Sequence, residues 1–126
     1  MLGRFLGAGL AALMLTVASS LDAGAAGDPA KGEQVYRRCQ GCHSIDRNRI
    51  GPMHKGLFGR KAGSLPGYDY SEAMKSSGIV WSEETLDRFL QGPRRMVPGT
   101  KMTFAGVANA KDRADLIAFL KQATKP

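Results

Sequence analysis

Hydrophobic residues fall on one face of a helix in two segments of the chain. The first face consists of Leu86, Phe89 and Leu90, which are spaced i, i+3 and i+4. Ser82 is suited to cap a helix that begins just before these residues, and Gly92-Pro93 ends it. The pattern therefore predicts a helix over about residues 83–91.

The second apolar face, formed by Leu116, Ile117 and Leu120, predicts the last helix of the chain. Asn109 and Asp112 have the spacing of a capping pair at its start. Both apolar faces are narrow, so each helix is expected to bury one side only.

A further helix is predicted nearer the N-terminus. Asp28 followed by Pro29 is typical of an N-cap and a first helical residue, and this helix is expected to run to about Arg38. Residues 43–70 contain many glycines and prolines and are predicted to be irregular, with a short helix after Tyr70. Since no segment has the alternation of a strand, the predicted fold class is all-α with long loops.

The first 25 residues have the pattern of a secretory signal peptide. Positive charge within residues 1–4 precedes an apolar run from residue 5 to residue 17, and Ala23-Gly24-Ala25 is a suitable cleavage site. A retained membrane anchor is the alternative, but the run is shorter than the about 20 residues that a membrane span needs. We therefore expect a signal peptide at residues 1–25 and an exported domain at residues 26–126, with no stable membrane insertion after cleavage.

The chain is basic, with a formal net charge of +7 at pH 7. Arg4 and Asp22 cancel, so the exported part has the same charge as the whole chain. A basic exported domain indicates an acidic protein partner or an anionic membrane, whereas export argues against nucleic acid. Its aliphatic residues are sparse, which indicates that a large apolar group completes a small core.

The strongest chemical motif is Cys39-Gln40-Gly41-Cys42-His43, a C-x-x-C-H sequence that contains both cysteines of the chain. Two thiols at this spacing can form thioethers with one haem, and the next imidazole can bind its iron. Three other interpretations are weaker. A disulfide requires no adjacent histidine, a thioredoxin-like site requires a βαβ pattern, and structural zinc requires four protein ligands. The motif predicts one covalent haem c with His43 as an iron ligand.

The residues alone leave the second axial ligand open. The chemically suitable side chains are His54, Met53, Met74, Met96 and Met102. Most methionines fill cores, but Met102 follows Pro98-Gly99-Thr100-Lys101, a loop that can place a thioether against a haem face. A His/Met pair raises the reduction potential and leaves no open position for a substrate, so it favours electron transfer over enzymatic catalysis.

The sequence as a whole resembles the small class I c-type cytochromes, meaning mitochondrial cytochrome c and its bacterial periplasmic relatives. The resemblance spans nearly all of residues 28–124. Its blocks are Cys39–His43, Gly51-Pro52, residues 56–61, 66–70, 78–81, 98–106 and 113–120. It implies an all-α cytochrome c fold, with three main helices, short helices and long loops around one covalently bound haem. It also implies a monomeric periplasmic protein that transfers single electrons and is not an enzyme.

The resemblance assigns roles to single residues. Cys39 and Cys42 match the thioether positions, and His43 and Met102 match the iron ligands. Pro52 matches the residue whose carbonyl accepts the N–H of the ligand imidazole. The positions around the haem propionates are matched by Tyr70, Trp81, Arg60 and Thr100. Where the first and last helices cross, the matching residues are Gly32, Tyr36, Leu116 and Phe119.

Three positions depart from the family pattern: Phe89, His54 and Met74, which replaces an asparagine of the buried water network. Phe89 stands where mitochondrial cytochrome c has a tyrosine beside the ligand sulfur, so we expect a somewhat lower potential. His54 stands where the family has a buried leucine, and we interpret it as a packed or partly exposed histidine that does not bind iron.

Basic side chains are expected to surround an exposed haem edge and to dock acidic faces of an oxidase, reductase or dehydrogenase. They are Lys101, Arg94, Arg95, Arg60 and Lys61. Two alternatives remain open at this point: an iron that Met102 binds weakly and that acts as a peroxidase or gas site, and a dedicated subunit of a dehydrogenase.

Overall fold

Five helices make up the regular structure of the residues that the computed structural model describes, residue 3 and residues 26–126. They are α1 (Pro29–Tyr36), α2 (Glu72–Lys75), α3 (Glu83–Gln91), α4 (Pro93–Met96) and α5 (Ala110–Ala123). Within these residues the only β-structure is an isolated bridge between Lys61 and Val80, which confirms the all-α prediction. The expected signal peptide lies outside the described residues, apart from residue 3.

No helix in the described part of the chain is long and apolar enough to cross a membrane.

Side-chain caps begin the three longest helices at the predicted residues. The Asp28 carboxylate accepts hydrogen bonds from the backbone N–H groups of the first turn of α1. Ser82 and Thr85 form a reciprocal capping box on α3. The Asn109 side chain accepts from the N–H of Asp112 at the start of α5. These contacts confirm the three predicted helix starts.

Helix α1 ends at Tyr36, two residues before the predicted end. The N–H of Arg38 donates to the carbonyl of Val35, and the N–H of Cys39 donates to that of Tyr36. Bonds between residues three apart tighten the backbone, so both cysteines lie on turns that follow the helix. Helix α4 was not predicted; Pro93 ends α3 but also supplies a suitable first residue for a new helical turn.

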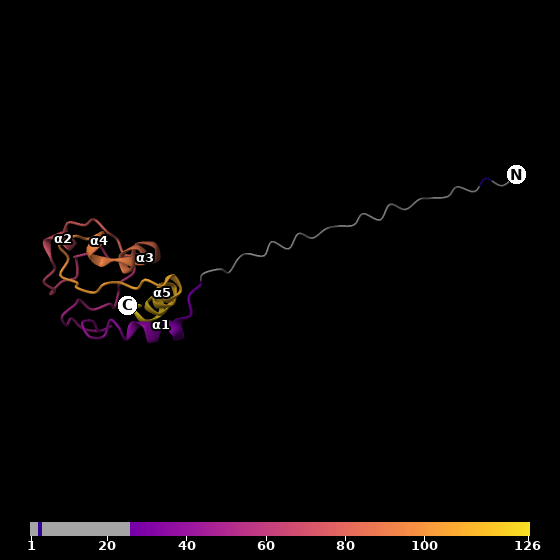
Figure 1. Cartoon of the computed structure of the whole chain (residues 1–126), viewed down its shortest axis with the longest axis horizontal. Helices are drawn as coiled ribbons and strands as arrows, with labels where there is room; N and C mark the ends of the chain where they lie inside the picture. The colour runs from indigo at the N-terminus through magenta and orange to yellow at the C-terminus, as the bar shows by residue number, and fades with distance from the viewer. Residues whose placement is uncertain (1–2, 4–25) are drawn as a thin grey trace.

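Helices α1 and α5 lie side by side at the end of the fold where the chain terminates (Figure 1). A methyl carbon added to Gly32 would lie 1.9 Å from the carbonyl oxygen of Asp115, so only glycine allows this approach. Tyr36 and Leu116 are almost fully buried between the two helices, and the ring of Tyr36 packs on that of Phe119. The expected helix crossing is confirmed, and it forms one wall behind the candidate site.

Candidate haem site

A cavity of about 280 Å³ opens between the α1–α5 pair and the loops that precede α2 and α5. Its lining is mostly apolar, and it includes Leu57, Leu86, Leu90 and Leu120. All nine site residues expected from the sequence line it: Cys39, Cys42, His43, Pro52, Arg60, Tyr70, Trp81, Thr100 and Met102. Residues more than 60 positions apart in the sequence are thus brought to one cavity.

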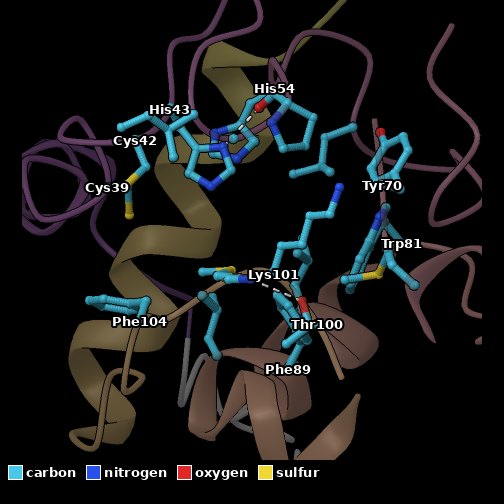
Figure 2. Close-up of a pocket in the computed structure, with 18 of the residues that line it drawn as sticks. Cys39, Cys42, His43, His54, Tyr70, Trp81, Phe89, Thr100, Lys101 and Phe104 are labelled. Atoms are coloured by element: carbon cyan, nitrogen blue, oxygen red, sulfur yellow. Dashed lines mark hydrogen bonds between the residues drawn. The ribbon is translucent and has the colours of Figure 1, made fainter. Parts of the chain in front are cut away.

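The predicted groups lie on different sides of this cavity (Figure 2). Cys39 and Cys42 lie at one edge, and Tyr70 and Trp81 lie at the opposite edge. His43 lies between these edges on one face, with Thr100 and Lys101 across the cavity from it. The arrangement separates two thiols, an imidazole and a set of hydrogen-bond donors.

The His43 ring is held in one orientation. Its Nδ1 lies 2.8 Å from the carbonyl oxygen of Pro52. Because a carbonyl only accepts, Nδ1 carries the proton and the lone pair of Nε2 is left for a metal. Burial lowers the pKa of His43 below its usual value, which keeps the imidazole in the neutral form that binds iron.

Gly51 explains how the loop fits around this ring. A methyl carbon added at Gly51 would lie 2.3 Å from Cε1 of His43, so any side chain there would displace the imidazole. The N–H of Gly51 donates to the carbonyl of Cys42, which joins the loop to the C-x-x-C-H turn.

The two cysteines are free thiols on tight turns. The N–H groups of Cys42 and His43 both donate to the carbonyl of Cys39, so the turn fixes the relative position of all three side chains. Burial raises the pKa of the Cys39 thiol to about 11. In the described residues no three His, Cys, Asp or Glu side chains are grouped to hold a metal ion on their own.

Of the five candidates for a second ligand, His54, Met74 and Met102 line the cavity. The His54 ring is stacked on that of His43, with centroids 4.2 Å apart, so it lies on the same face (Figure 2). Met74 lies in α2 and is buried in the core. Met102 is partly buried and follows the loop that faces His43, and its N–H donates to the Thr100 hydroxyl.

The C-terminal end of the loop that carries Met102 is attached to α3 and α5. The N–H of Val107 donates to the carbonyl of Leu90 at the end of α3. The buried guanidinium of Arg113 donates to Asp87 on α3 and to the carbonyls of Val107 and Ala108. These contacts restrict the positions that the Met102 thioether can take.

Hydrogen-bond donors belong to two sides of the cavity, with Tyr70 and Trp81 at the edge opposite the cysteines and Thr100 across from His43. Tyr70, Trp81 and Thr100 each bring an O–H or N–H group to its lining. Arg60 donates to the carbonyls of Met53 and Lys55, which uses two of its five N–H groups. A buried anionic group needs such partners because an unpaired charge is costly away from water.

The residues present therefore fit a haem c. The cavity is apolar in the middle, with thiols at one edge, donors for carboxylates at the other, and a neutral imidazole on one face. Sequence reasoning missed the contact of Gly51 with the His43 ring. It also missed Arg49, whose guanidinium donates to the carbonyls of Gln40 and His43 and so holds the C-x-x-C-H turn.

The sequence reasoning also missed the environment of His54. Its Nδ1 lies 3.0 Å from the Tyr36 hydroxyl, eighteen residues earlier in the chain. Burial lowers the pKa of His54 to about 3 and raises that of Tyr36 to about 12, so both side chains are neutral. No periodicity or spacing rule relates these two positions.

Comparisons with known proteins give consistent matches. The Cytochrome c family model matches residues 29–124. Cytochrome c2 of Rhodomicrobium vannielii is 53% identical over 104 residues, which cover 80% of this chain and 83% of that protein. Cytochrome c2 of Blastochloris viridis is 46% identical over 112 residues, which cover 86% and 88%. The structure of cytochrome cH from Methylobacterium extorquens aligns with a TM-score of 0.74 and 43% identity, and covers 76% of this chain and 99% of that one.

Proposed function

Because the chain belongs to the cytochrome c family, whose members bind one covalent haem c and carry electrons, we propose that it is a periplasmic electron carrier with His43 and Met102 as iron ligands. The observation that carries this proposal is the neutral His43 imidazole, which faces the Met102 loop across one apolar cavity. When bound, haem supplies a one-electron change between ferrous and ferric iron.

Each group of residues has its own task in this proposal. The Cys39 and Cys42 thiols form the thioethers, and the carbonyl of Pro52 keeps the lone pair of His43 directed at the iron. The leucines of the lining exclude water, which limits the reorganisation that accompanies electron transfer. With His43 and Met102 both holding the iron, the chain would leave no position on it for a substrate.

The hydrogen-bond donors of the lining hold the propionates in this proposal. Tyr70, Trp81 and Thr100 donate to them, and the cation of Arg60 lies close by to offset their charge. Burial lowers the pKa of Arg60 from its usual value. A guanidinium nevertheless keeps its charge in proteins.

The docking surface for acidic partners is smaller than the five basic residues suggest. Lys101 forms an ion pair with Asp69 at 2.9 Å, and Arg60 is turned toward backbone carbonyls. Arg94, Arg95 and Lys61 are exposed, and none forms an ion pair within the described residues. We assign the steering of redox partners mainly to these three cations.

The ligand assignment is tested with Met102→Leu, which removes the thioether but keeps an apolar side chain of similar size. The charge-transfer absorption band of a methionine–iron bond in the ferric protein should disappear, and added imidazole should then bind the iron. Met96→Leu is the matched control, because Met96 does not line the cavity. A band that survives Met102→Leu would refute the assignment, and a missing band in the unchanged protein would favour an open-site enzyme.

The periplasmic location has its own test. N-terminal sequencing of protein from a periplasmic fraction is expected to begin at Ala26. Recovery of a chain that begins at Met1 in the membrane fraction would refute both cleavage and periplasmic release.

A further inference from the structure

A hydrogen-bonded pair of polar side chains, Tyr36 and His54, lies behind His43. The Tyr36 hydroxyl is 3.0 Å from Nδ1 of His54, and Tyr36 is 2% exposed. The His54 ring is stacked on that of His43, with the two planes inclined by 21°. Burying a hydroxyl and an imidazole is costly unless they bond to each other, so the pair is a specific arrangement within the apolar core.

Three neighbours restrict the His43 ring, and they differ in rigidity. The carbonyl of Pro52 accepts from Nδ1, and the backbone of Gly51 lies so near the ring that an added methyl carbon would be 2.3 Å from Cε1. These two contacts belong to the main chain. The third, the stacked ring of His54, belongs to a side chain whose terminal torsion is broad unless something else holds it. The Tyr36 hydroxyl supplies that restraint.

We propose that Tyr36 and His54 are positioning residues: the Tyr36 hydroxyl holds the His54 ring, and that ring sets the plane of the His43 imidazole at the iron. This inference rests on the proposed role of His43 as an iron ligand. Groups that orient a metal ligand also tune the metal, so the pair affects the reduction potential and the electronic structure of ferric iron.

A purely structural role makes a different prediction. Tyr36 also packs its ring on Phe119 at a centroid distance of 5.2 Å, between α1 and α5. Tyr36→Phe keeps that ring and removes only the oxygen. Its effect on stability therefore reports on lost hydrogen bonding, whereas its effect at the iron reports on the orientation of His43.

The test uses the haem-loaded protein and two readouts, the proton NMR shifts of the haem methyl groups in the ferric state and the reduction potential. The methyl shifts report the plane of the axial imidazole. For Tyr36→Phe we expect a changed methyl pattern and an at least threefold change in the one-electron equilibrium constant, which equals about 28 mV at 59 mV per tenfold. His54→Leu should change both readouts at least as much.

A double-mutant cycle tests whether the hydroxyl acts through His54. In the His54→Leu background, Tyr36→Phe should produce no further change in methyl shifts or potential. Phe119→Leu is the matched control, because it alters packing on Tyr36 but leaves the hydroxyl and His54 in place. It should lower the melting temperature and leave the methyl pattern unchanged.

Two results would overturn the inference. One is a Tyr36→Phe protein whose melting temperature falls while its methyl pattern and potential stay the same. The other is a full effect of Tyr36→Phe in the His54→Leu background. Ferric spectra of the unchanged protein that lack a coordinated His43 would overturn the proposed function as well, so the two failures are distinguishable.

Discussion

The orientation of the His43 imidazole depends on one residue that has no side chain. Gly51 lies against the ring so closely that a methyl carbon would be 2.3 Å from Cε1. The adjacent carbonyl of Pro52 accepts from Nδ1 at 2.8 Å. The Gly51-Pro52 pair therefore does two things: it leaves space for the ring and it fixes the ring's tautomer.

Gly51→Ala is expected to destabilise the haem-loaded protein by about 2–3 kcal/mol, because an overpacked core must shift its neighbours. The free energy of unfolding in urea measures this change. Gly41→Ala is the matched control, since a methyl carbon at Gly41 meets nothing within 4 Å. Equal losses for the two variants would contradict the proposed contact.

Phe89 is the second position at which one atom matters. It lines the cavity, and its ring lies 5.0 Å from that of Trp81. Phe89→Tyr would add a hydroxyl that can donate to the ligand sulfur and withdraw electron density from it. We expect a higher reduction potential in a redox titration, and a lower potential would refute the argument.

At the scale of elements, the sequence predicted helix starts better than helix ends. Asp28, Ser82 and Asn109 cap their helices through side chains a few residues away, which is local chemistry that a sequence reveals. The end of α1 is set by the turn that carries Cys39 and Cys42 and by its tertiary contacts. Helix boundaries of this kind shift by a residue or two without any change in pattern.

In the site, too, local patterns were predictable from the sequence, whereas contacts between distant segments were not. All nine expected residues line one cavity. They could be predicted because each belongs to a sequence block that resembles the family pattern. The Tyr36–His54 bond and the contacts of Arg113 with the end of the Met102 loop were not predicted. Both depend on how distant segments pack, and neither residue type had a partner suggested by spacing.

Asp115 links α5 to the start of α1. Its carboxylate accepts from Lys111 and, at 2.7 Å, from the N–H of Asp28. The pKa of Asp115 is held below 3.8, mainly by the hydrogen bond from Lys111 and next by the bond from the N–H of Asp28. The charge of Lys31 lowers it further. A lowered folded-state pKa adds stability that is present above the unfolded pKa and is lost as pH falls through the folded one.

We therefore expect Asp115→Asn to be less stable than the unchanged protein by a constant amount between about pH 5 and pH 7. The difference should shrink below about pH 4, as the carboxylate takes up a proton. Melting temperatures of both proteins across this range give the result. A stability difference that does not depend on pH would show that the packing of the Asp115 side chain, and not its charge, joins α5 to the start of α1.

At the scale of the whole molecule, the charge distribution decides which partners approach. The net charge of +7 is carried by residues on many faces, and several cations are paired, as in the Arg88–Glu84 and Lys121–Glu83 contacts. Arg94 and Arg95 lie together on α4, just before the loop that carries Thr100 and Met102. These two charges form no ion pair within residues 26–126, and their place next to this loop favours an anionic partner there.

The rate of oxidation by the anion ferricyanide should fall as ionic strength rises, because salt screens the attraction. A combined Arg94→Gln and Arg95→Gln variant should react more slowly and depend less on salt. The matched control, Lys31→Gln with Lys125→Gln, removes the same charge from α1 and from residue 125, which lie outside α4 and the loop that follows it. A control that slows the reaction as much as the test variant would mean that net charge alone acts.

We propose that Cys39, Cys42, His43 and Met102 together hold one haem. The most direct measurement is the absorption spectrum of the purified protein in ferric and dithionite-reduced states, combined with a pyridine haemochrome assay. We predict one c-type haem per chain, sharp reduced bands and a ferric methionine–iron band. Protein without haem would contradict the interpretation of the C-x-x-C-H turn, and haem without the methionine band would contradict the assignment of Met102.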